Sequence, residues 1–476
     1  MIFSSVLFLF SFLPLVLGLY YLAPNKMKNF VLLIVSLIFY TWGEDKIVVV
    51  MLLSAMIDFS CGLLIERGNR KIGLAISICT NLSFLLFFKY FNFAFENYNY
   101  VVATLGLEGA IFHNIPQIAL PIGISFYTFQ TLSYTIDVYR GTVKANHNFI
   151  NFATYVTMFP QLVAGPIVRY ADINEQLANK HISIDDFSIG IERFIIGLAK
   201  KVLIANTFAT IADSIFTLDA TDVSTPFVWL GIIAYSFQIY FDFSGYSDMA
   251  IGLGRMFGFR FLENFNYPYI STSIKEFKSI SEFWRRWHIS LSSWFRDYLY
   301  ISLGGSRVGN KRLYLNLFIV FFVTGLWHGA SWSFVVWGLF HGVFIVIERV
   351  GFGDVLQKAW KPFQHLYTLL VVLVGWVFFR AETLSDAMEY LQQMFVPSSG
   401  LAATNSYLSF LYLNSYTILF LIIAIICSTP VYQFFDKKLQ TSQGAIFRIV
   451  VLFTLFILSV IYLGAGSYNP FIYFRF

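Results

Sequence analysis

Charged residues are scarce in this 476-residue sequence. Only 12% of the residues are Asp, Glu, Lys or Arg, whereas 57% are hydrophobic. Soluble domains contain about 25% charged and about 45–50% apolar residues, and a water-soluble chain of this composition would expose large apolar patches and aggregate. The shortage of charge therefore excludes a soluble globular protein. The net charge of +5 comes from short basic loops between apolar runs, which argues against nucleic-acid binding.

Cysteines and cofactor-binding motifs are also lacking. The three cysteines, Cys61, Cys79 and Cys427, lie in apolar stretches without C-x-x-C spacing, so we expect buried, inert thiols. No H-x-x-x-H motif and no Cys/His pair at ligand spacing is present, and we therefore predict no metal site. The sequence also has no P-loop, no G-x-G-x-x-G motif and no G-x-S-x-G motif, which argues against the enzyme classes that use them.

Long apolar runs make up most of the chain. A membrane span needs about 20 mostly apolar residues, and the first such run, Ile2 to Leu22, lacks the basic region of a signal peptide. We predict an all-α integral membrane protein with roughly eleven transmembrane helices plus re-entrant and interfacial helices, forming one polytopic domain over residues 1–476. The candidate segments are 2–22, 28–42, 47–65, 72–92, 117–137, 149–168, 187–215, 226–257, 313–329, 332–348, 364–380, 412–435 and 447–466.

Loop charges predict the orientation in the membrane. Short loops rich in Lys and Arg stay in the cytoplasm, and this places the basic segment 275–312 inside. Residues 381–411 contain no Lys or Arg and are predicted to face outward. Counting spans from these segments puts both termini outside.

His328 ends an apolar run and is flanked by Gly325 and Gly329. An ionisable group at bilayer depth costs about 2.5–3.5 kcal/mol on insertion scales, so it marks a functional site by default. The small glycines allow another backbone or a substrate to approach closely. Two interpretations remain open: a general base near neutral pH, or a neutral histidine bonded to a helix carbonyl.

Residues 284–297 show helical spacing with a tryptophan stripe. Trp284, Trp287, Leu291 and Trp294 share one face, as expected for a helix lying in the cytoplasmic interface. The helix either only anchors the protein in lipid or also uses its arginines, Arg285, Arg286 and Arg296, with Lys311 and Arg312, to hold a phosphorylated donor. Within the span near 226–257, Asp242 and Asp248 either line a cavity or brace helices.

Together these motifs resemble the membrane-bound O-acyltransferase (MBOAT) family, in its bacterial AlgI/PatA/DltB-like branch. The resemblance rests on LPIGISFYTF at 120–129, FPQLVAGP at 159–166, FDFSGYSD at 241–248, ENFNYPY at 263–269, and the segments 284–296 and 324–329. It implies a core over about residues 115–350, with helices in a ring around a tunnel where a cytoplasmic acyl thioester meets its acceptor. His328 matches the catalytic histidine of the family, and His288 matches a second histidine typical of this branch. The expected substrate-binding residues are Arg285, Arg286, Trp287, Asp242, Asp248 and Trp327.

The last six residues, FIYFRF at 471–476, resemble the F-x-Y-F-x-F tail of some cell-surface acylation systems. The implied role is a tyrosine acyl shuttle at Tyr473, with an aromatic interface anchor as the alternative. A phenol has a pKa near 10, so its ester is a better acyl donor than an alkyl ester. In one respect the sequence departs from the family: S-I-K-E-F-K at 273–278 precedes a second copy, S-I-S-E-F-W, as a six-residue tandem insertion.

The resemblance implies an O-acyltransferase in the bacterial inner membrane. We expect acetyl-CoA or another acyl thioester as donor, no tightly bound cofactor, an extracytoplasmic SGNH-type acyltransferase as partner, and O-acetylation of a cell-surface or exported polysaccharide. The alternatives are D-alanyl transfer to teichoic acid, peptidoglycan O-acetylation, and, in another class, a polysaccharide or ion transporter.

Overall fold

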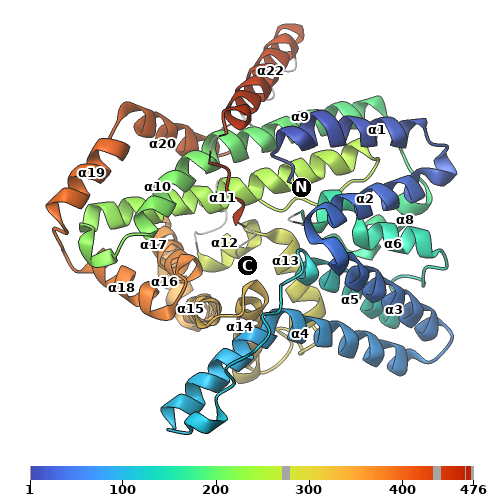
Figure 1. The fold of residues 1–476 in the computed structure, drawn as a ribbon, viewed down its shortest axis with the longest axis horizontal. Helices are drawn as coiled ribbons and strands as arrows, with labels where there is room; N and C mark the ends of the chain where they lie inside the picture. Colours follow the sequence, from blue (N-terminus) through green and yellow to red (C-terminus); the bar gives the residue numbers. More distant parts are fainter. Residues whose placement is uncertain (1, 164, 271–278, 432–440, 467, 473–476) are drawn as a thin grey trace. The chain divides into compact units, whose positions relative to one another are not determined.

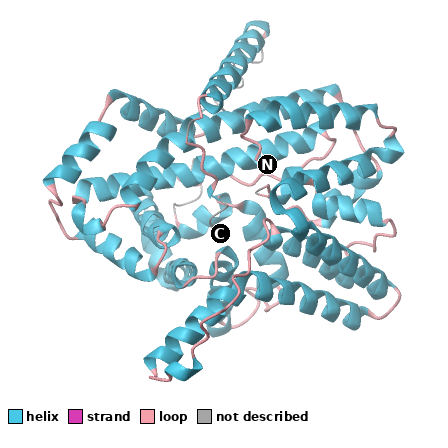
Figure 2. Cartoon of the chain, in the orientation of Figure 1, coloured by secondary structure: helices cyan, strands magenta, loops and turns pink. Residues whose placement is uncertain are grey.

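A computed structural model describes residues 2–163, 165–270, 279–431, 441–466 and 468–472. This part of the chain is built from helices and contains no β-strand (Figure 2). The predicted all-α class is therefore confirmed.

Residue contacts divide the chain into two compact units. The first comprises Met1–Gly190, Ala250–Leu262 and Gly329–Ser331. Its helices are α1 (Leu13–Leu22), α2 (Lys28–Glu44), α3 (Val48–Glu66), α4 (Arg70–Thr104), α5 (Ile124–Arg140), α6 (Phe149–Thr157), α7 (Phe159–Leu162) and α8 (Tyr170–Ala178) (Figure 1).

The second unit comprises Ile191–Met249, Glu263–His328 and Trp332–Phe476, and it holds His328. Two helices, α9 (Ile184–Ala199) and α11 (Thr225–Met256), contribute residues to both units. The remaining helices of the second unit are α10 (Asn206–Phe216), α12 (Ile280–Arg286), α13 (Ile289–Trp294), α14 (Asn310–His328), α15 (Trp332–Ile347), α16 (Gly353–Lys358), α17 (Lys361–Arg380), α18 (Leu384–Phe395), α19 (Ala402–Tyr412), α20 (Ser415–Cys427) and α22 (Ser442–Gly464) (Figure 1).

Seven helices in the described residues are long and apolar enough to cross a membrane, or eight if the bent pair α19 and α20 forms one span. The chain is thus a multi-span membrane protein, with fewer spans by this measure than the roughly eleven predicted from span length. Several predicted runs form short or broken helices. The run at 149–168 is divided at Met158, two residues before Pro160, into α6 and α7, and the run at 117–137 becomes helical only from Ile124.

Close packing of α14 against α15 positions His328. A Cβ atom on Gly325 would collide with the carbonyl oxygen of Phe334, and one on Gly338 would collide with that of Phe321. Without these side chains the two backbones come into contact, as small residues allow in membrane helices. The expectation that Gly325 permits a close backbone approach is confirmed, and His328 sits at the end of this tightly packed pair.

The tryptophan-rich segment differs from the single interfacial helix that its spacing predicted. It forms two short helices, α12 and α13, which are separated at Trp287 and His288. His288 has φ 45° and ψ 55°, a left-handed conformation that a non-glycine residue seldom adopts and that cannot continue an α-helix. The stripe residues are buried within the second unit, with Trp284 8% and Trp287 3% exposed. The stripe therefore packs in the protein core, which argues against the alternative that this segment only anchors the protein in lipid.

Candidate active site

His328 is the last residue of α14 and is 7% exposed. Its imidazole is enclosed by aromatic rings from three helices. Ring centroids lie 4.9 Å away for Trp327, 4.9 Å for Trp337 on α15 and 5.1 Å for Phe379 on α17, all with steep interplanar angles. These contacts fix the ring orientation and exclude bulk water, which strengthens electrostatic interactions at the imidazole.

A narrow cavity reaches the His328 side chain, with room for about one water molecule. Its wall is formed by residues from α11, α12–α13, α15, α17 and the C-terminal segment: Ile239, Phe243, Trp287, Trp337, Trp376, Phe379 and Ile472. Apart from the imidazole, the lining side chains are apolar or aromatic. The cavity therefore admits a small, slender group next to His328 and gives little space for a long acyl chain.

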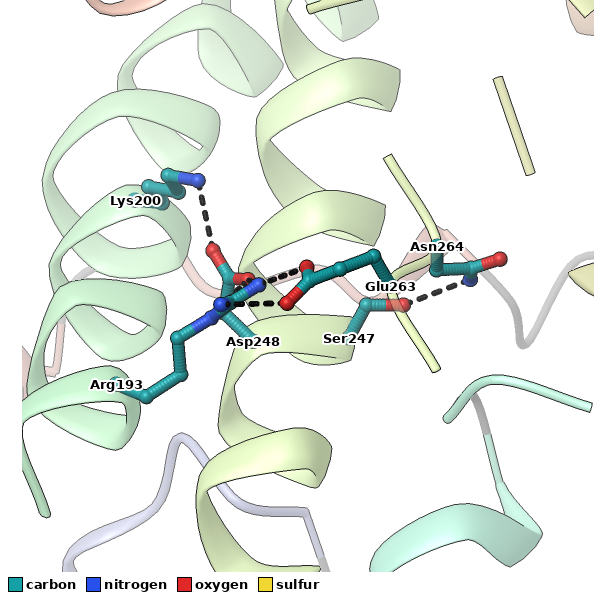
Figure 3. Close-up of polar contacts among 6 residues, drawn as sticks. All are labelled: Arg193, Lys200, Ser247, Asp248, Glu263 and Asn264. Carbon is teal, nitrogen blue, oxygen red and sulfur yellow. Dashed lines mark hydrogen bonds and ion pairs between the residues drawn. The ribbon is translucent and has the colours of Figure 1, made fainter. Parts of the chain in front are cut away.

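His288 is fully buried, and its neighbours determine which ring nitrogen carries the proton. The side-chain amide of Asn264 donates to Ser247 at 2.8 Å (Figure 3), so the Asn264 oxygen is the acceptor that lies 3.1 Å from His288 Nδ1. Nδ1 must therefore bear the hydrogen. His288 Nε2 has no hydrogen-bond partner among the described residues, so its lone pair remains available. Burial lowers the pKa of His288 to about 3, which keeps the ring neutral at physiological pH.

Acid is expected to destabilise the fold through His288. The pKa of this residue is depressed from 6.5 to about 3 in the folded protein, so the unfolded chain binds more protons between these values. Stability is then complete above pH 6.5 and falls as the pH drops through this window. In His288→Asn, which tolerates the left-handed backbone, the fall should be shallower. The measurement is thermal unfolding of the purified protein in detergent from neutral to acid pH. Parallel pH curves for the two proteins would rule this out.

A larger cavity of about 430 Å³ is lined in part by Trp284 and carries two cationic side chains, Arg285 and Arg296. It also contacts Thr324 on α14, one turn before His328. The other expected donor-binding residues are placed elsewhere. Arg286 is bound to Glu282 and to the carbonyl of Asn266, and Trp287 lines the His328 cavity. Of the arginines expected in this segment, the structure brings Arg285 and Arg296 to this cavity and not Arg286.

Asp248 belongs to a charge cluster. Arg193 lies 2.7 Å from one of its oxygens and Lys200 lies 2.7 Å from the other, and Arg193 also pairs with Glu263 (Figure 3). Because both Asp248 oxygens have cationic partners, this cluster favours bracing of α9 against α11 over a free carboxylate in a cavity.

Asp242 lies on the same helix but has different partners. It pairs with Lys201 at 2.8 Å and accepts the backbone N–H of Ile472, also at 2.8 Å. The structure therefore places Asp242 against the C-terminal segment of the chain. Tyr473, the residue that follows Ile472, lies outside the described residues.

Sequence reasoning missed several ionisable residues in the second unit. Lys200, Lys201, Asp213 and Arg380 all lie inside apolar runs, and Arg380 pairs with Asp213 at 2.8 Å. The argument that an ionisable group at bilayer depth needs a reason applies to them as it does to His328. That signal was in the sequence and would have found them.

Comparison with known proteins identifies the family. The model of the MBOAT, membrane-bound O-acyltransferase, family matches residues 142–385. The chain is 42% identical, over the full length of both proteins, to a probable alginate O-acetylase AlgI of Pseudomonas putida. It is 35% identical to a peptidoglycan O-acetyltransferase of Helicobacter pylori, over 83% of this chain and 80% of that protein. It is 29% identical to a teichoic acid D-alanyltransferase of Bacillus subtilis, over 54% of this chain and 66% of that protein. Together with the multi-span helical fold, these matches establish that the chain belongs to the membrane-bound O-acyltransferase family.

Proposed function

We propose that this protein O-acetylates an exported or cell-surface polysaccharide of the alginate type. The observation that carries the proposal is that His328 and Ile472 line one narrow, apolar cavity. This supports transfer of a small acyl group to the tail segment, with His328 as the base. The full-length likeness to a probable alginate O-acetylase supports acetyl as the group and a polysaccharide as the acceptor.

The reaction begins with a hydroxyl activated by His328. The imidazole takes the hydroxyl proton while the oxygen attacks the thioester carbonyl carbon, the C–S bond breaks, and the thiolate leaves and recovers the proton from the imidazolium. The products are an ester and a free thiol. The phenol of Tyr473 is the proposed hydroxyl because Tyr473 is bonded to Ile472, and consecutive Cα atoms are about 3.8 Å apart. We assign His288 the role of a hydrogen-bond acceptor in the reaction, through the lone pair on Nε2. Trp327 contacts the rings of His288 and His328 and orients both.

The donor is a cytoplasmic thioester, most simply acetyl-CoA, acting as a substrate. Its proposed entry is the cavity at Arg285 and Arg296, because guanidinium groups bind phosphates well. This cavity also contacts Thr324, which lies one turn before His328 on α14. Arg286 supports this entry by holding Glu282, and Trp287 lines the His328 cavity.

The proposed setting is the bacterial inner membrane, with further short helices raising the number of spans toward eleven around a tunnel. The donor side faces the cytoplasm and the tail faces outward. An SGNH-type acyltransferase outside the membrane then passes the acetyl group from the tyrosine ester to the polymer. The likeness to a peptidoglycan O-acetyltransferase supports peptidoglycan as the second candidate acceptor.

The acceptor and the acyl group can be tested together. The gene is expressed in an alginate-producing strain that lacks its own acetylase, and the ester-linked acetyl and D-alanyl contents of purified alginate, peptidoglycan and any teichoic acid are measured. We expect O-acetyl groups that depend on the introduced gene on alginate alone. O-acetylated peptidoglycan would replace the first acceptor by the second, and gene-dependent ester-linked D-alanine on any polymer would refute acetyl transfer.

A further inference from the structure

A buried ion pair contacts the backbone of the C-terminal segment. Lys201, in the π-helical turn η5 (Lys200–Ala205), lies 2.8 Å from Asp242 on α11, and the two side chains are 1% and 2% exposed. Lys201 also donates to the carbonyl of Pro470. Asp242 accepts the N–H of Ile472 at 2.8 Å. Each member of the pair therefore makes one hydrogen bond to the tail.

A second ion pair holds the segment a few residues earlier. Asp213 on α10 pairs with Arg380 on α17 through one oxygen, and its other oxygen accepts the Tyr468 hydroxyl at 2.8 Å. Between the two pairs, the Asn206 amide donates to the Asn469 side chain at 3.1 Å. The tail is thus held at several consecutive positions by groups from three helices.

The hydrophobic contacts agree with this arrangement. The ring of Phe471 lies 4.5 Å from that of Tyr246 on α11, and Phe471 and Ile472 are 5% and 4% exposed. An ion pair that only braced two helices would need no contact with a chain terminus. Here Lys201, the donor, faces the carbonyl of Pro470, and Asp242, the acceptor, faces the N–H of Ile472. The polarity of the ion pair therefore matches that of the backbone groups it contacts.

The geometry points to a docking site for residues 468–472, formed by Lys201, Asp242, Asp213 and Arg380, that holds the tail at the His328 cavity. Lys201, Asp242 and Asp213 contact the tail, and Arg380 holds Asp213. All four are positioning residues, because none of them contacts the reacting atoms. The docking stands on the contacts above. Its purpose, to present Tyr473 to His328, rests on the proposed function.

Accessibility of the tail tests the docking directly. A single cysteine, Ile472→Cys, is placed in a background of Cys61→Ala, Cys79→Ser and Cys427→Ser, and its rate of labelling by a small maleimide is measured in membranes. The double variant Lys201→Met with Asp242→Asn removes both charges and so leaves no unpaired buried ion. We expect its labelling to be roughly tenfold faster or more, because the hydrogen bond to Pro470 is lost and the one from Ile472 no longer has a charged acceptor.

The chain offers a matched control one residue away. Lys200→Met with Asp248→Asn neutralises the ion pair that also joins η5 to α11. None of the tail contacts described above involves this pair. Labelling should stay at the rate of the parent. Equal rates in the two double variants would overturn the docking site. A tail-side variant, Tyr468→Phe with Asn469→Leu, changes no buried charge and should give an intermediate rise, so a folding defect in the first variant does not decide the question.

Kinetics separate docking from its purpose. In the same preparations, the docking variant should lower kcat for acyl transfer and leave the KM for acetyl-CoA unchanged, because the donor enters at the separate cavity of Arg285. Faster labelling with unchanged kcat would keep the docking and overturn its positioning role. Failure of the tyrosine shuttle would give a different combination of results. Tyr473→Phe would retain full activity, while the labelling rate of Ile472→Cys would still depend on Lys201 and Asp242.

Discussion

Replacement of His328 by alanine is expected to lower acyl transfer by about 10²–10⁴-fold, the usual contribution of a positioned general base. The imidazole is the polar group of an otherwise apolar and aromatic cavity wall, so no other lining side chain can take the hydroxyl proton. The measurement is the rate of thiol release from acetyl-CoA by purified protein, together with the acetyl content of the exported polymer.

A second variant separates chemistry from packing. His328→Gln keeps most of the volume among Trp327, Trp337 and Phe379 but removes the base, and it should be as inactive as the alanine variant. His113→Ala, at an exposed position in the first unit, serves as the control and should retain full activity. Normal transfer by a folded His328→Gln protein would end the catalytic assignment.

Loss of one oxygen atom at Tyr473 should abolish transfer to the polymer. Tyr473→Phe keeps the aromatic ring and therefore any anchoring in the membrane interface, but it cannot form an ester. In the wild type, incubated with acetyl-CoA and quenched in acid, mass spectrometry of the C-terminal peptide should detect an acetylated tyrosine. This peptide should be unmodified in Tyr473→Phe and in His328→Gln.

A neighbouring phenol provides the comparison. Tyr462→Phe, near the end of α22, removes the hydroxyl that lies 3.2 Å from that of Tyr416, and it should leave polymer acetylation unchanged. Full polymer acetylation by Tyr473→Phe would reduce the tail to an aromatic anchor. Thiol release without acetylated tyrosine would mean that the acyl group passes directly to another acceptor.

The sequence was most informative where one residue type has one physical meaning. Apolar run length predicted a helical membrane protein, and the glycine at 325 predicted the close approach of α15 that leaves His328 at a helix end. His328 was found because a lone ionisable group in an apolar run is costly. Each of these inferences needs only local sequence.

Features that depend on distant partners were not predictable in the same way. The break at His288 results from its contacts with Asn264 and from burial of the flanking tryptophans, whereas spacing alone favoured one continuous helix. Arg286 looked equivalent to Arg285, but Glu282 binds Arg286 at hydrogen-bond distance and lies 3.6 Å from Arg285. The contrast between Asp242 and Asp248 depends on which lysine each one meets, and this is decided by the path of another helix.

Lys200 and Lys201 are consecutive, yet they pair with Asp248 and Asp242, which lie six residues apart. We attribute this to the π-helical turn that contains both lysines. In a regular α-helix consecutive side chains diverge by about 100°, and the wider turn at Lys200–Ala205 sets where each lysine points. A deletion or insertion in this turn would rotate the rest of the segment and exchange the partners of the two lysines. The lysine that contacts the tail would then face Asp248, which braces α9 against α11. We therefore expect a change in the length of Lys200–Ala205 to be tolerated less well than a substitution within it. In chimeras between relatives, the junction should lie outside this segment.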